Sequence, residues 1–346
     1  MTITLEEALA ELRKARKLVL TAHQNPDGDA IGSLLGLGHM LQALGKDILL
    51  LLDDDVPTRY DVLPGHELIQ KPEEGKTYQA DLLVVLDASL DRIGAVRDAV
   101  QATILNIDHH PTNGGAADFL YLDGHRAATA EIIYQLWELS GVELTLPLAM
   151  ALYTGIATDT GFFKFSNTSP FTMRSAARLL EAGVEPNIIS EAMEIRPYSH
   201  VKGLADALQH VELWHEGRAA GVFLSYEQMQ EIEATDSLID MLRVIEGVEI
   251  ATVLKYKEEG KARVSMRSNG IDVSAIATKF GGGGHKRAAG CGIEKPYDEA
   301  RQELKAAIDA ALAPTDKVDE AQAALREAAG AGDPTQPSAA IGAAAQ

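Results

Sequence analysis

The chain has 346 residues and a formal net charge of -20, and 46% of its residues are hydrophobic. This length exceeds what one compact core usually organises, so we expect two domains. The negative charge argues against a surface that coats long nucleic acids, because such surfaces depend on clustered Lys and Arg. No apolar stretch approaches the ~20 residues that span a bilayer, no signal peptide is recognisable, and Cys291 has no partner for a disulfide. These features predict a cytoplasmic protein that is not bound to a membrane.

The first half of the sequence alternates predicted strands and predicted helices. Strands are predicted over 17–22, 47–52, 82–86 and 103–107, and helices over 30–44, 130–139 and 146–158. This alternation is typical of an α/β domain in which helices cover both faces of a parallel sheet. We assign residues 1–185 to this domain.

The pattern changes near residue 186. A connector over 186–212 is predicted to hold two short helices, over 187–192 and 201–211. Residues 213–312 are predicted to form a smaller α+β domain, with strands over 219–224, 249–256 and 262–266 and a helix over 298–312. Residues 313–346 are rich in Ala, Gly, Pro and Gln without apolar periodicity, which indicates a disordered tail.

The first predicted strand is followed by a short run of metal-binding residue types. His23, Asp27 and Asp29 lie in the run His-Gln-Asn-Pro-Asp-Gly-Asp, whose proline and glycine indicate a tight loop. In an extended loop, two carboxylates two residues apart face opposite ways, so each is expected to serve a different cation. The helix that follows presents an N-terminus, which favours anions.

Further acids and histidines follow other predicted elements of the first domain. Asp87 comes directly after the third strand, and Asp108, His109 and His110 come directly after the fourth. Asp159 follows the last of the helices. Open parallel sheets bind their ligands at the carboxyl ends of the strands. Carboxylates and imidazoles there suit Mn²⁺, with Mg²⁺ or Zn²⁺ as alternatives, and a pair of such cations activates water towards a phosphate.

Taken singly, each of these residues has a simpler interpretation. A lone aspartate at a strand end is usually a loop cap, and Asp53 to Asp55 are interpreted as a solvated turn. Independent caps do not explain four clusters in the same topological place. The conjunction therefore favours a metal site.

The second domain carries a separate motif for an anionic ligand. Residues 281–285 read Gly-Gly-Gly-Gly-His, in which the glycines let backbone N–H groups approach an anion and His285 adds a donor. Arg267 and Ser268 end a predicted strand, where the guanidinium can bind phosphate. Residues 255–287 include eight basic and three acidic residues, a local charge of +5. A glycine run by itself is equally typical of a flexible linker.

As a set and in this order, these motifs resemble the DHH–DHHA1 phosphoesterases. The resemblance extends over residues 1–312 and is strongest to the NrnA-like subgroup of nanoRNases and phosphoadenosine phosphate phosphatases. It implies a catalytic DHH domain, a substrate-binding DHHA1 domain and a pair of Mn²⁺ ions. The motifs that carry it are the run over 23–33, Asp87, Asp-His-His over 108–110, Asp159 and the glycine-histidine run over 281–285.

The resemblance also implies a role for each matching residue. One ion would be held by His23, Asp27 and Asp87. The other would be held by Asp29, Asp87, His109 and Asp159, so that Asp87 bridges the pair. Asp108 would orient the histidines, and His110 would contact the reacting phosphate. The substrate would further be held by Arg267, Ser268, Gly282, Gly283, Gly284 and His285.

The activity that the resemblance implies is manganese-dependent hydrolysis of short oligoribonucleotides to mononucleotides, with 3′-phosphatase activity on 3′,5′-adenosine bisphosphate. Short RNA or DNA and the bisphosphate are the expected partners, while linear dinucleotides and a homodimer stay open. The alternatives are a soluble cyclic or linear dinucleotide phosphodiesterase, a RecJ-like single-strand exonuclease, a family-II-like inorganic pyrophosphatase and a non-catalytic nucleotide-binding module. The glycine-histidine run argues against the pyrophosphatase, and the complete ligand set argues against the binding module.

Overall fold

The computed structural model describes residues 1–232, 237–258 and 260–313, so the predicted tail beyond residue 313 lies outside the described residues. Within this part of the chain, no helix is long and apolar enough to cross a membrane.

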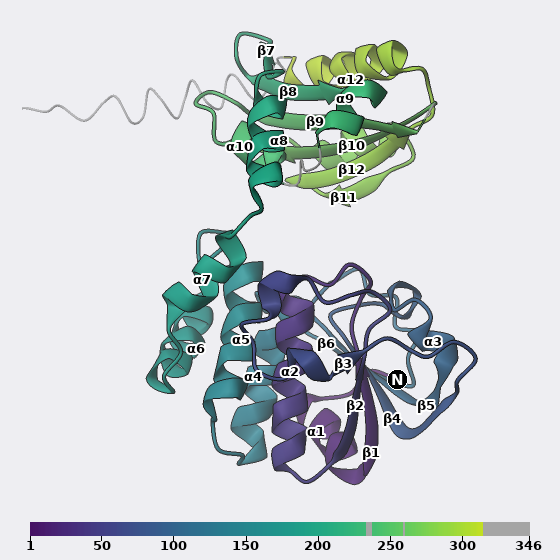
Figure 1. The fold of residues 1–346 in the computed structure, drawn as a ribbon, viewed down its shortest axis with the longest axis vertical. Coiled ribbons are helices and arrows are strands. Elements are labelled where there is room, and N and C mark those ends of the chain that lie inside the picture. The colour runs from purple at the N-terminus through teal and green to yellow at the C-terminus, as the bar shows by residue number, and fades with distance from the viewer. Residues whose placement is uncertain (233–236, 259, 314–346) are drawn as a thin grey trace, which may run out of the picture. The chain divides into compact units, whose positions relative to one another are not determined.

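The chain forms two compact units, of which the first ends at Ile195 and the second begins at Arg196 (Figure 1). The two helices of the predicted connector fall in different units. α7 (Pro186–Glu194) closes the first unit, and α8 (Tyr198–Leu208) opens the second.

A six-stranded sheet forms the centre of the first unit, and all its neighbouring strands run parallel. In spatial order the strands are β3 (Ile69–Gln70), β2 (Asp47–Leu51), β1 (Lys17–Thr21), β4 (Tyr78–Leu86), β5 (Val100–Asp108) and β6 (Phe119–Leu122). The four predicted strands are confirmed. The two strands that the sequence did not predict, β3 and β6, are short and lie at the two edges.

The strands were predictable because both faces of the sheet are buried. Leu18 and Leu20 of β1 belong to the core under the long helices, whereas Val19 between them belongs to the core on the opposite face. β4 alternates in the same way. A strand that is buried on both faces needs an uninterrupted apolar run, and such a run is visible in the sequence.

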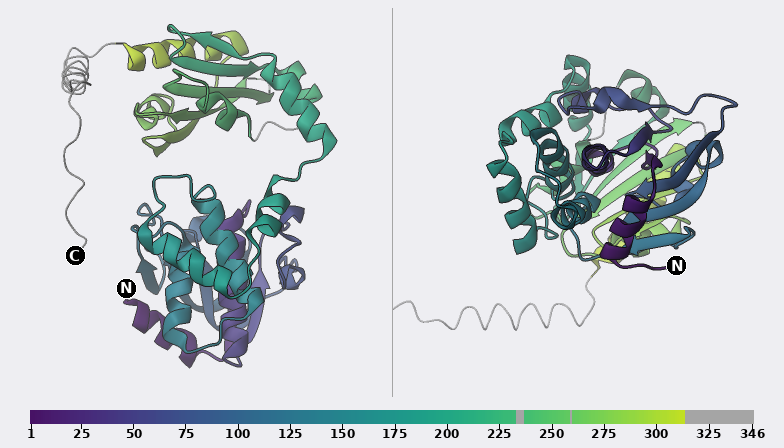
Figure 2. Two further views of the ribbon diagram at one scale, coloured as in Figure 1. Left: turned by 90° about the vertical axis from the view of Figure 1, so that its left-hand side faces the viewer. Right: turned by 90° about the horizontal axis from the view of Figure 1, so that it is seen from below.

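Helices cover the two faces of this sheet unequally. One face carries α1 (Leu5–Lys14), α2 (Gly28–Ala43), α4 (Thr129–Ser140) and α5 (Leu146–Asp159), of which the last three lie side by side (Figure 1 and Figure 2). The core on the other face includes Ile93, which follows η3 (Leu90–Arg92), and Val96 of α3 (Val96–Ala99). Outside these layers lie η1 (Thr58–Tyr60), η2 (His66–Leu68) and α6 (Pro170–Glu181), which packs against α5.

α2 and α5 approach each other closely through glycines. A Cβ atom on Gly32 would lie 2.5 Å from the carbonyl oxygen of Ala151 and 2.7 Å from the backbone nitrogen of Gly155. One turn earlier, a Cβ atom on Gly28 would lie 2.2 Å from the hydroxyl of Thr158. Both glycines are therefore required by contact with α5. We predicted from the sequence that Gly28 lies in a tight loop. That interpretation is wrong, because Gly28 is the first residue of α2.

We predict that Gly32→Ala lowers the free energy of unfolding by about 1–3 kcal/mol, because its Cβ atom would push two backbones apart. Gly38→Ala on the same helix is the matched control. Its Cβ atom would meet side chains no closer than 3.5 Å, so the better helix propensity of Ala should leave stability unchanged or raised by up to about 1 kcal/mol. Urea denaturation measures both variants, and equal midpoints would contradict the close contact.

The second unit is built on a mixed six-stranded sheet, as predicted for an α+β domain. In spatial order its strands are β11 (Gly283–His285), β12 (Ala288–Ile293), β10 (Lys261–Ser268), β9 (Ile250–Glu258), β8 (Ala219–Leu224) and β7 (Glu212–Trp214). β8 and β9 are parallel, and the other neighbours are antiparallel.

The two faces of this second sheet are covered differently. One face is covered by α11 (Val273–Lys279) and α12 (Tyr297–Leu312). The other face packs under α8, α9 (Tyr226–Glu231) and α10 (Leu238–Arg243). Among the described residues, the apolar cluster under these three helices takes strand residues from β8 and β9, so the outer strands β10, β12 and β11 present a face outside that cluster.

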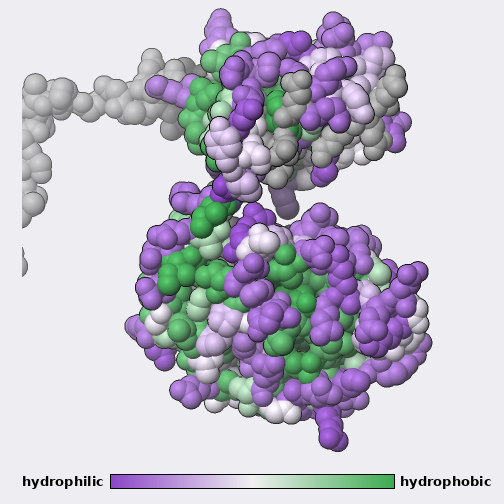
Figure 3. Space-filling model, viewed as in Figure 1, coloured by the Kyte–Doolittle hydropathy of each residue, from purple (hydrophilic) through white to green (hydrophobic). Residues whose placement is uncertain are grey.

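Apolar surface is visible where the first unit ends. Ile188 on α7 is 38% exposed, and Ile195 just after it is 73% exposed. Figure 3 shows this part of the first unit as green surface beside polar neighbours. The apolar surface therefore adjoins the residue at which the chain passes into the second unit.

Candidate functional site

The structure brings the predicted metal ligands of the first unit together at the carboxyl ends of β1, β4 and β5. Among the described residues, three overlapping groups place their ligand atoms within 4.8 Å of one another. These groups are His23 with Asp27 and Asp87, Asp29 with His109 and Asp159, and Asp87 with His109 and His110. Each of the six residues predicted as ligands thus belongs to at least one group.

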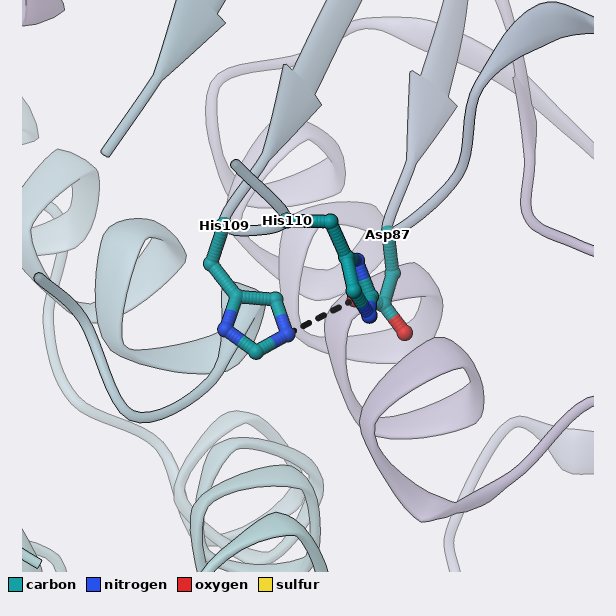
Figure 4. Close-up of side chains that lie close together, drawn as sticks. All are labelled: Asp87, His109 and His110. Atoms are coloured by element: carbon teal, nitrogen blue, oxygen red, sulfur yellow. Dashed lines mark ion pairs between the residues drawn. The ribbon is translucent and has the colours of Figure 1, made fainter. Parts of the chain in front are cut away.

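Asp87 lies at the centre of this arrangement. Its Oδ2 atom is 3.5 Å from Nε2 of His23, and its Oδ1 atom is 3.5 Å from Nε2 of His109. Figure 4 shows the imidazoles of His109 and His110 beside this carboxylate. The φ angle of Asp87 is +57°, an uncommon value for a residue with a side chain and one that concentrates at functional sites. The two oxygens of one buried carboxylate therefore face two separate groups.

Backbone contacts fix which ring nitrogen of two histidines faces the carboxylates. Nδ1 of His23 lies 2.8 Å from the carbonyl oxygen of Gln24, and Nδ1 of His109 lies 3.2 Å from that of Arg126. A carbonyl oxygen only accepts, so each Nδ1 donates, and Nε2 is the nitrogen that faces the carboxylates. Without its proton, this nitrogen offers a lone pair to a cation placed between it and the carboxylate oxygens.

The charge balance of the site leads to the same conclusion. Burial lowers the pKa of His23, but hydrogen bonds to Asp27 and Asp87 outweigh it and raise that pKa to about 10. Burial and the charges of Asp29 and Asp27 raise the pKa of Asp159 to about 8. Burial, followed by the charge of Asp29, also raises the pKa of Asp87. The crowded carboxylates thus require positive charge, which a proton or a metal cation supplies.

Asp27 and Asp29 are placed by a helix, so the extended loop that the sequence predicted here is wrong. Asp27 caps α2, because its Oδ1 atom accepts from the backbone nitrogens of Asp29 and Ala30 at 3.0 and 3.1 Å. Asp29 already lies in the first turn of α2, which begins two residues before the predicted start at Ala30. The two carboxylates nevertheless join different groups, since Asp27 neighbours His23 and Asp29 neighbours His109.

Asp29 also joins α2 to α4. Its Oδ2 atom accepts from the backbone nitrogen of Thr129 at 2.6 Å, and its Oδ1 atom accepts from that of Ala130 at 2.8 Å. No side chain of the preceding residues caps α4, so Asp29 supplies the cap from another helix. The hydroxyl of Thr129 donates to Asp87 at 2.9 Å. The N-terminus of α4 thereby positions two of the predicted ligands.

Asp108 contacts one histidine of the pair. Its Oδ1 atom accepts from Nδ1 of His110 at 2.8 Å, and Asn113 donates to its other oxygen at 2.6 Å. His109 instead uses the carbonyl oxygen of Arg126, so the predicted contact of Asp108 with both histidines is limited to His110. Burial raises the pKa of Asp108, but hydrogen bonds from His110 outweigh it and lower that pKa overall.

Two positioning residues, Asp53 and Asp54, were missed by the sequence analysis. Asp53 accepts from the side-chain amide of Gln24 at 2.6 Å, and Asp54 accepts from the backbone nitrogen of Asn25 at 2.6 Å. These contacts hold the loop after His23, a role that the interpretation of Asp53 and Asp54 as a solvated turn did not include. The partners are 29 residues apart, and no local pattern marks such a contact.

In the second unit, strand pairing aligns Arg267 with His285. Both pair with Ala288, Arg267 across from β10 and His285 across from β11. Residues paired across neighbouring strands present their side chains on the same face of a sheet. Ala288 lies between the two polar side chains, and Gly290 is the next residue of β12 on the same face. The result is a floor of small residues bordered by a guanidinium and an imidazole.

The glycine run is part of the folded sheet, so the flexible-linker interpretation is wrong. Gly283 and Gly284 begin β11, and a Cβ atom on Gly282 would lie 2.2 Å from the carbonyl oxygen of Gly290. The hydroxyl of Ser268 donates to the carbonyl oxygen of Ile271. That contact closes the loop after β10 and occupies the proton that Ser268 would offer to a phosphate.

Comparison with known proteins assigns both units. Residues 17–156 match the DHH family, N-terminal domain, and residues 221–314 match the DHHA1 domain. A protein of Thermus thermophilus named bifunctional oligoribonuclease and PAP phosphatase NrnA is 36% identical over 87% of this chain and 92% of its own length. The chain belongs to the DHH–DHHA1 family. The resemblance seen in the sequence motifs is thereby confirmed.

A second relative and one solved structure are also similar to this chain. A protein of Bacillus subtilis with the same name is 30% identical over 82% of this chain and 91% of its own length. The crystal structure of an exopolyphosphatase-related protein from Bacteroides fragilis superposes with a TM-score of 0.79, covering 88% of this chain and 95% of that one. At 23% identity the latter shows a shared fold.

We predict that Asp87→Asn abolishes high-affinity binding of two Mn²⁺ ions, because the carboxylate faces both groups. Asp27→Asn should weaken the binding of one of the two ions, since Asp27 belongs to only one of the three groups of described residues. Asp108→Asn is the control, because Asp108 contacts His110 and none of the three groups includes it. Electron paramagnetic resonance titration gives the stoichiometry. Two tightly bound ions in the Asp87→Asn protein would refute the shared position of Asp87.

Proposed function

We propose that this DHH–DHHA1 protein is a manganese-dependent phosphoesterase. Its reactions would be the hydrolysis of short oligoribonucleotides to mononucleotides and the removal of the 3′-phosphate from 3′,5′-adenosine bisphosphate. The observation that carries the proposal is Asp87, whose two oxygens face His23 on one side and His109 on the other. The names of the relatives from Thermus thermophilus and Bacillus subtilis support the substrate class.

The proposed ligand sets follow the groups of side chains around Asp87. One Mn²⁺ ion would be held by His23, Asp27 and Asp87, and the other by Asp29, Asp87, His109 and Asp159. Mixed carboxylate and imidazole donors suit Mn²⁺. Divalent cations bound there would lower the pKa of a water molecule and neutralise charge on the phosphate oxygens.

His110 is proposed to contact the phosphate. Its Nδ1 atom is bound to Asp108 at 2.8 Å, and its side chain is 35% exposed, compared with 13% for His109. With Nδ1 donating to Asp108, Nε2 is the atom left to face a phosphate oxygen, and it donates to that oxygen when the ring is an imidazolium. Asn113 and the backbone of His110 also hold Asp108, so the imidazole is held before substrate arrives.

The second unit is proposed to bind the rest of the substrate. Arg267 and His285 on one face of the sheet would hold a terminal phosphate or the base-bearing end, and the backbone of Gly282 to Gly284 would border the same site. Small side chains such as Ala288 leave room for a flat base on that face. Arg267 offers a planar fork of donors, which matches the oxygens of phosphate.

The activity is tested with labelled oligonucleotides from two to many nucleotides long and with 3′,5′-adenosine bisphosphate, each with Mn²⁺. Turnover should fall as the substrate lengthens, because a chain of net charge -20 repels the added phosphates outside its basic segment. Processive decay of long strands would favour a RecJ-like exonuclease. Tight Mn²⁺ binding without hydrolysis of any substrate would favour the nucleotide-binding module.

We predict that Arg267→Ala raises the KM for a dinucleotide about tenfold or more, because a charge-assisted contact to phosphate contributes roughly 1.5–3 kcal/mol. Mn²⁺ stoichiometry should not change. Lys279→Ala is the matched control, since Lys279 is an exposed cation on α11, which packs on the opposite face of the sheet. Loss of manganese from the Arg267→Ala protein, or an equal rise of KM in the control, would count against this assignment.

A further inference from the structure

The loop that follows Asp159 has an unusual backbone. Gly161, Phe162 and Phe163 are consecutive and have φ angles of +58°, +55° and +65°. Side chains rarely adopt this left-handed region, and bulky residues that do so concentrate at functional sites. The strain at two phenylalanines next to a proposed metal ligand therefore requires an explanation.

Hydrogen bonds close this loop back onto Asp159. The backbone nitrogen of Phe165 donates to the carbonyl oxygen of Thr160 at 2.9 Å, and the hydroxyl of Thr160 accepts from the backbone nitrogen of Phe163 at 3.1 Å. The side chain of Asn167 donates to the carbonyl oxygen of Asp159 at 3.1 Å. The loop is thus built to return the chain to the metal site.

The three phenylalanines of this loop have different environments. Phe162 and Phe163 are partly buried and pack against the core of the first unit. Phe165 is 47% exposed and lies outside the core clusters of the described residues. The strained backbone therefore delivers one aromatic ring to the surface while its two neighbours are anchored.

One face of the Phe165 ring rests on Gly161. A Cβ atom on Gly161 would lie 2.4, 2.6 and 2.7 Å from three ring carbons, Cζ, Cε1 and Cε2. Three nearly equal distances place that position over the face of the ring, because an approach from the edge would separate them. The exposed area of the ring accordingly lies on its other face and its edges.

The ring rests on a residue that lies close in the chain to the proposed metal ligand Asp159. Gly161 is two residues from Asp159, so their Cα atoms are at most roughly 7 Å apart. The Asp159 carboxylate in turn lies 3.6 Å from Nε2 of His109. A flat aromatic face next to such a site matches the flat face of a nucleobase attached to the reacting phosphate.

We propose that Phe165 is a stacking platform for the nucleobase next to the scissile phosphate, an inference that rests on the proposed function. Every base has a π-face, so stacking tolerates all four bases and selects for the presence of a base. The structure thereby separates two kinds of recognition: side chains around Asp87 face the phosphate, and Phe165 faces the base.

The test compares Phe165→Leu, Phe165→Tyr and the unchanged protein. Each is measured for KM on a 5′-phosphorylated adenosine dinucleotide and on two analogues in which one base at a time is replaced by hydrogen. Binding of a non-hydrolysable phosphonate-linked dinucleotide is measured by calorimetry with Mn²⁺. Leu139→Ala is the matched control, because Leu139 is 44% exposed on α4, ten residues from the helix N-terminus at the site.

We expect Phe165→Leu to raise the KM and the Kd for the dinucleotide about tenfold, while Phe165→Tyr and Leu139→Ala keep both constants. On one of the two base-free analogues, the Phe165→Leu protein and the unchanged protein should have the same KM. If Phe165→Leu raised the KM for both base-free analogues by the same factor as for the dinucleotide, the ring would have a structural role and the inference would be wrong. An unchanged Kd of the Phe165→Leu protein for the phosphonate-linked dinucleotide would also overturn the inference. Tight binding of the phosphonate without hydrolysis of the natural dinucleotide would overturn the proposed function alone.

Discussion

The contact between α2 and α5 is the constraint on which the geometry of the candidate metal site depends. Gly32 lies against the backbone of α5 at Gly155, at a distance that excludes a Cβ atom. Asp29 lies one turn before Ser33 on α2, and its Oδ1 accepts from that hydroxyl at 3.1 Å. Asp159 lies one turn after Gly155 on α5. A wider separation of the two helices would therefore move Asp29 and Asp159 apart and dissolve their common group.

The same carboxylates hold the fold together and define the site. Asp27 caps its own helix, and Asp29 caps α4 from a distance of 100 residues in sequence. Helix N-termini favour negative charge, which helps these carboxylates to gather. The compensation is incomplete, because burial still raises the pKa of Asp29. A cluster that folding assembles and helix ends only partly neutralise is well suited to bind divalent cations.

In the second unit, strand pairing alone brings the candidate substrate-binding residues together. Arg267, Ala288 and His285 come from three neighbouring strands, and their register puts them in one row. The glycine at 282 lets β11 pass close to β12, where any side chain would meet backbone atoms. The guanidinium of Arg267 and the imidazole of His285 thus border a surface of small residues, which suits a phosphate and a flat base.

The sequence by itself determined the fold class, the four central strands and the clusters of acids and histidines that follow the strands, and the resemblance to a known family narrowed these clusters to six ligand candidates. It did so because strands buried on both faces need continuous apolar runs and because parallel strands gather their carboxyl ends at one edge. Tertiary structure decided what joins these parts. The cap that Asp29 gives to α4 and the hydrogen bond from the backbone nitrogen of Asn25 to Asp54 are contacts between distant segments. Local patterns do not encode such contacts, since a carboxylate that accepts a distant backbone N–H has the same sequence signature as one that faces water.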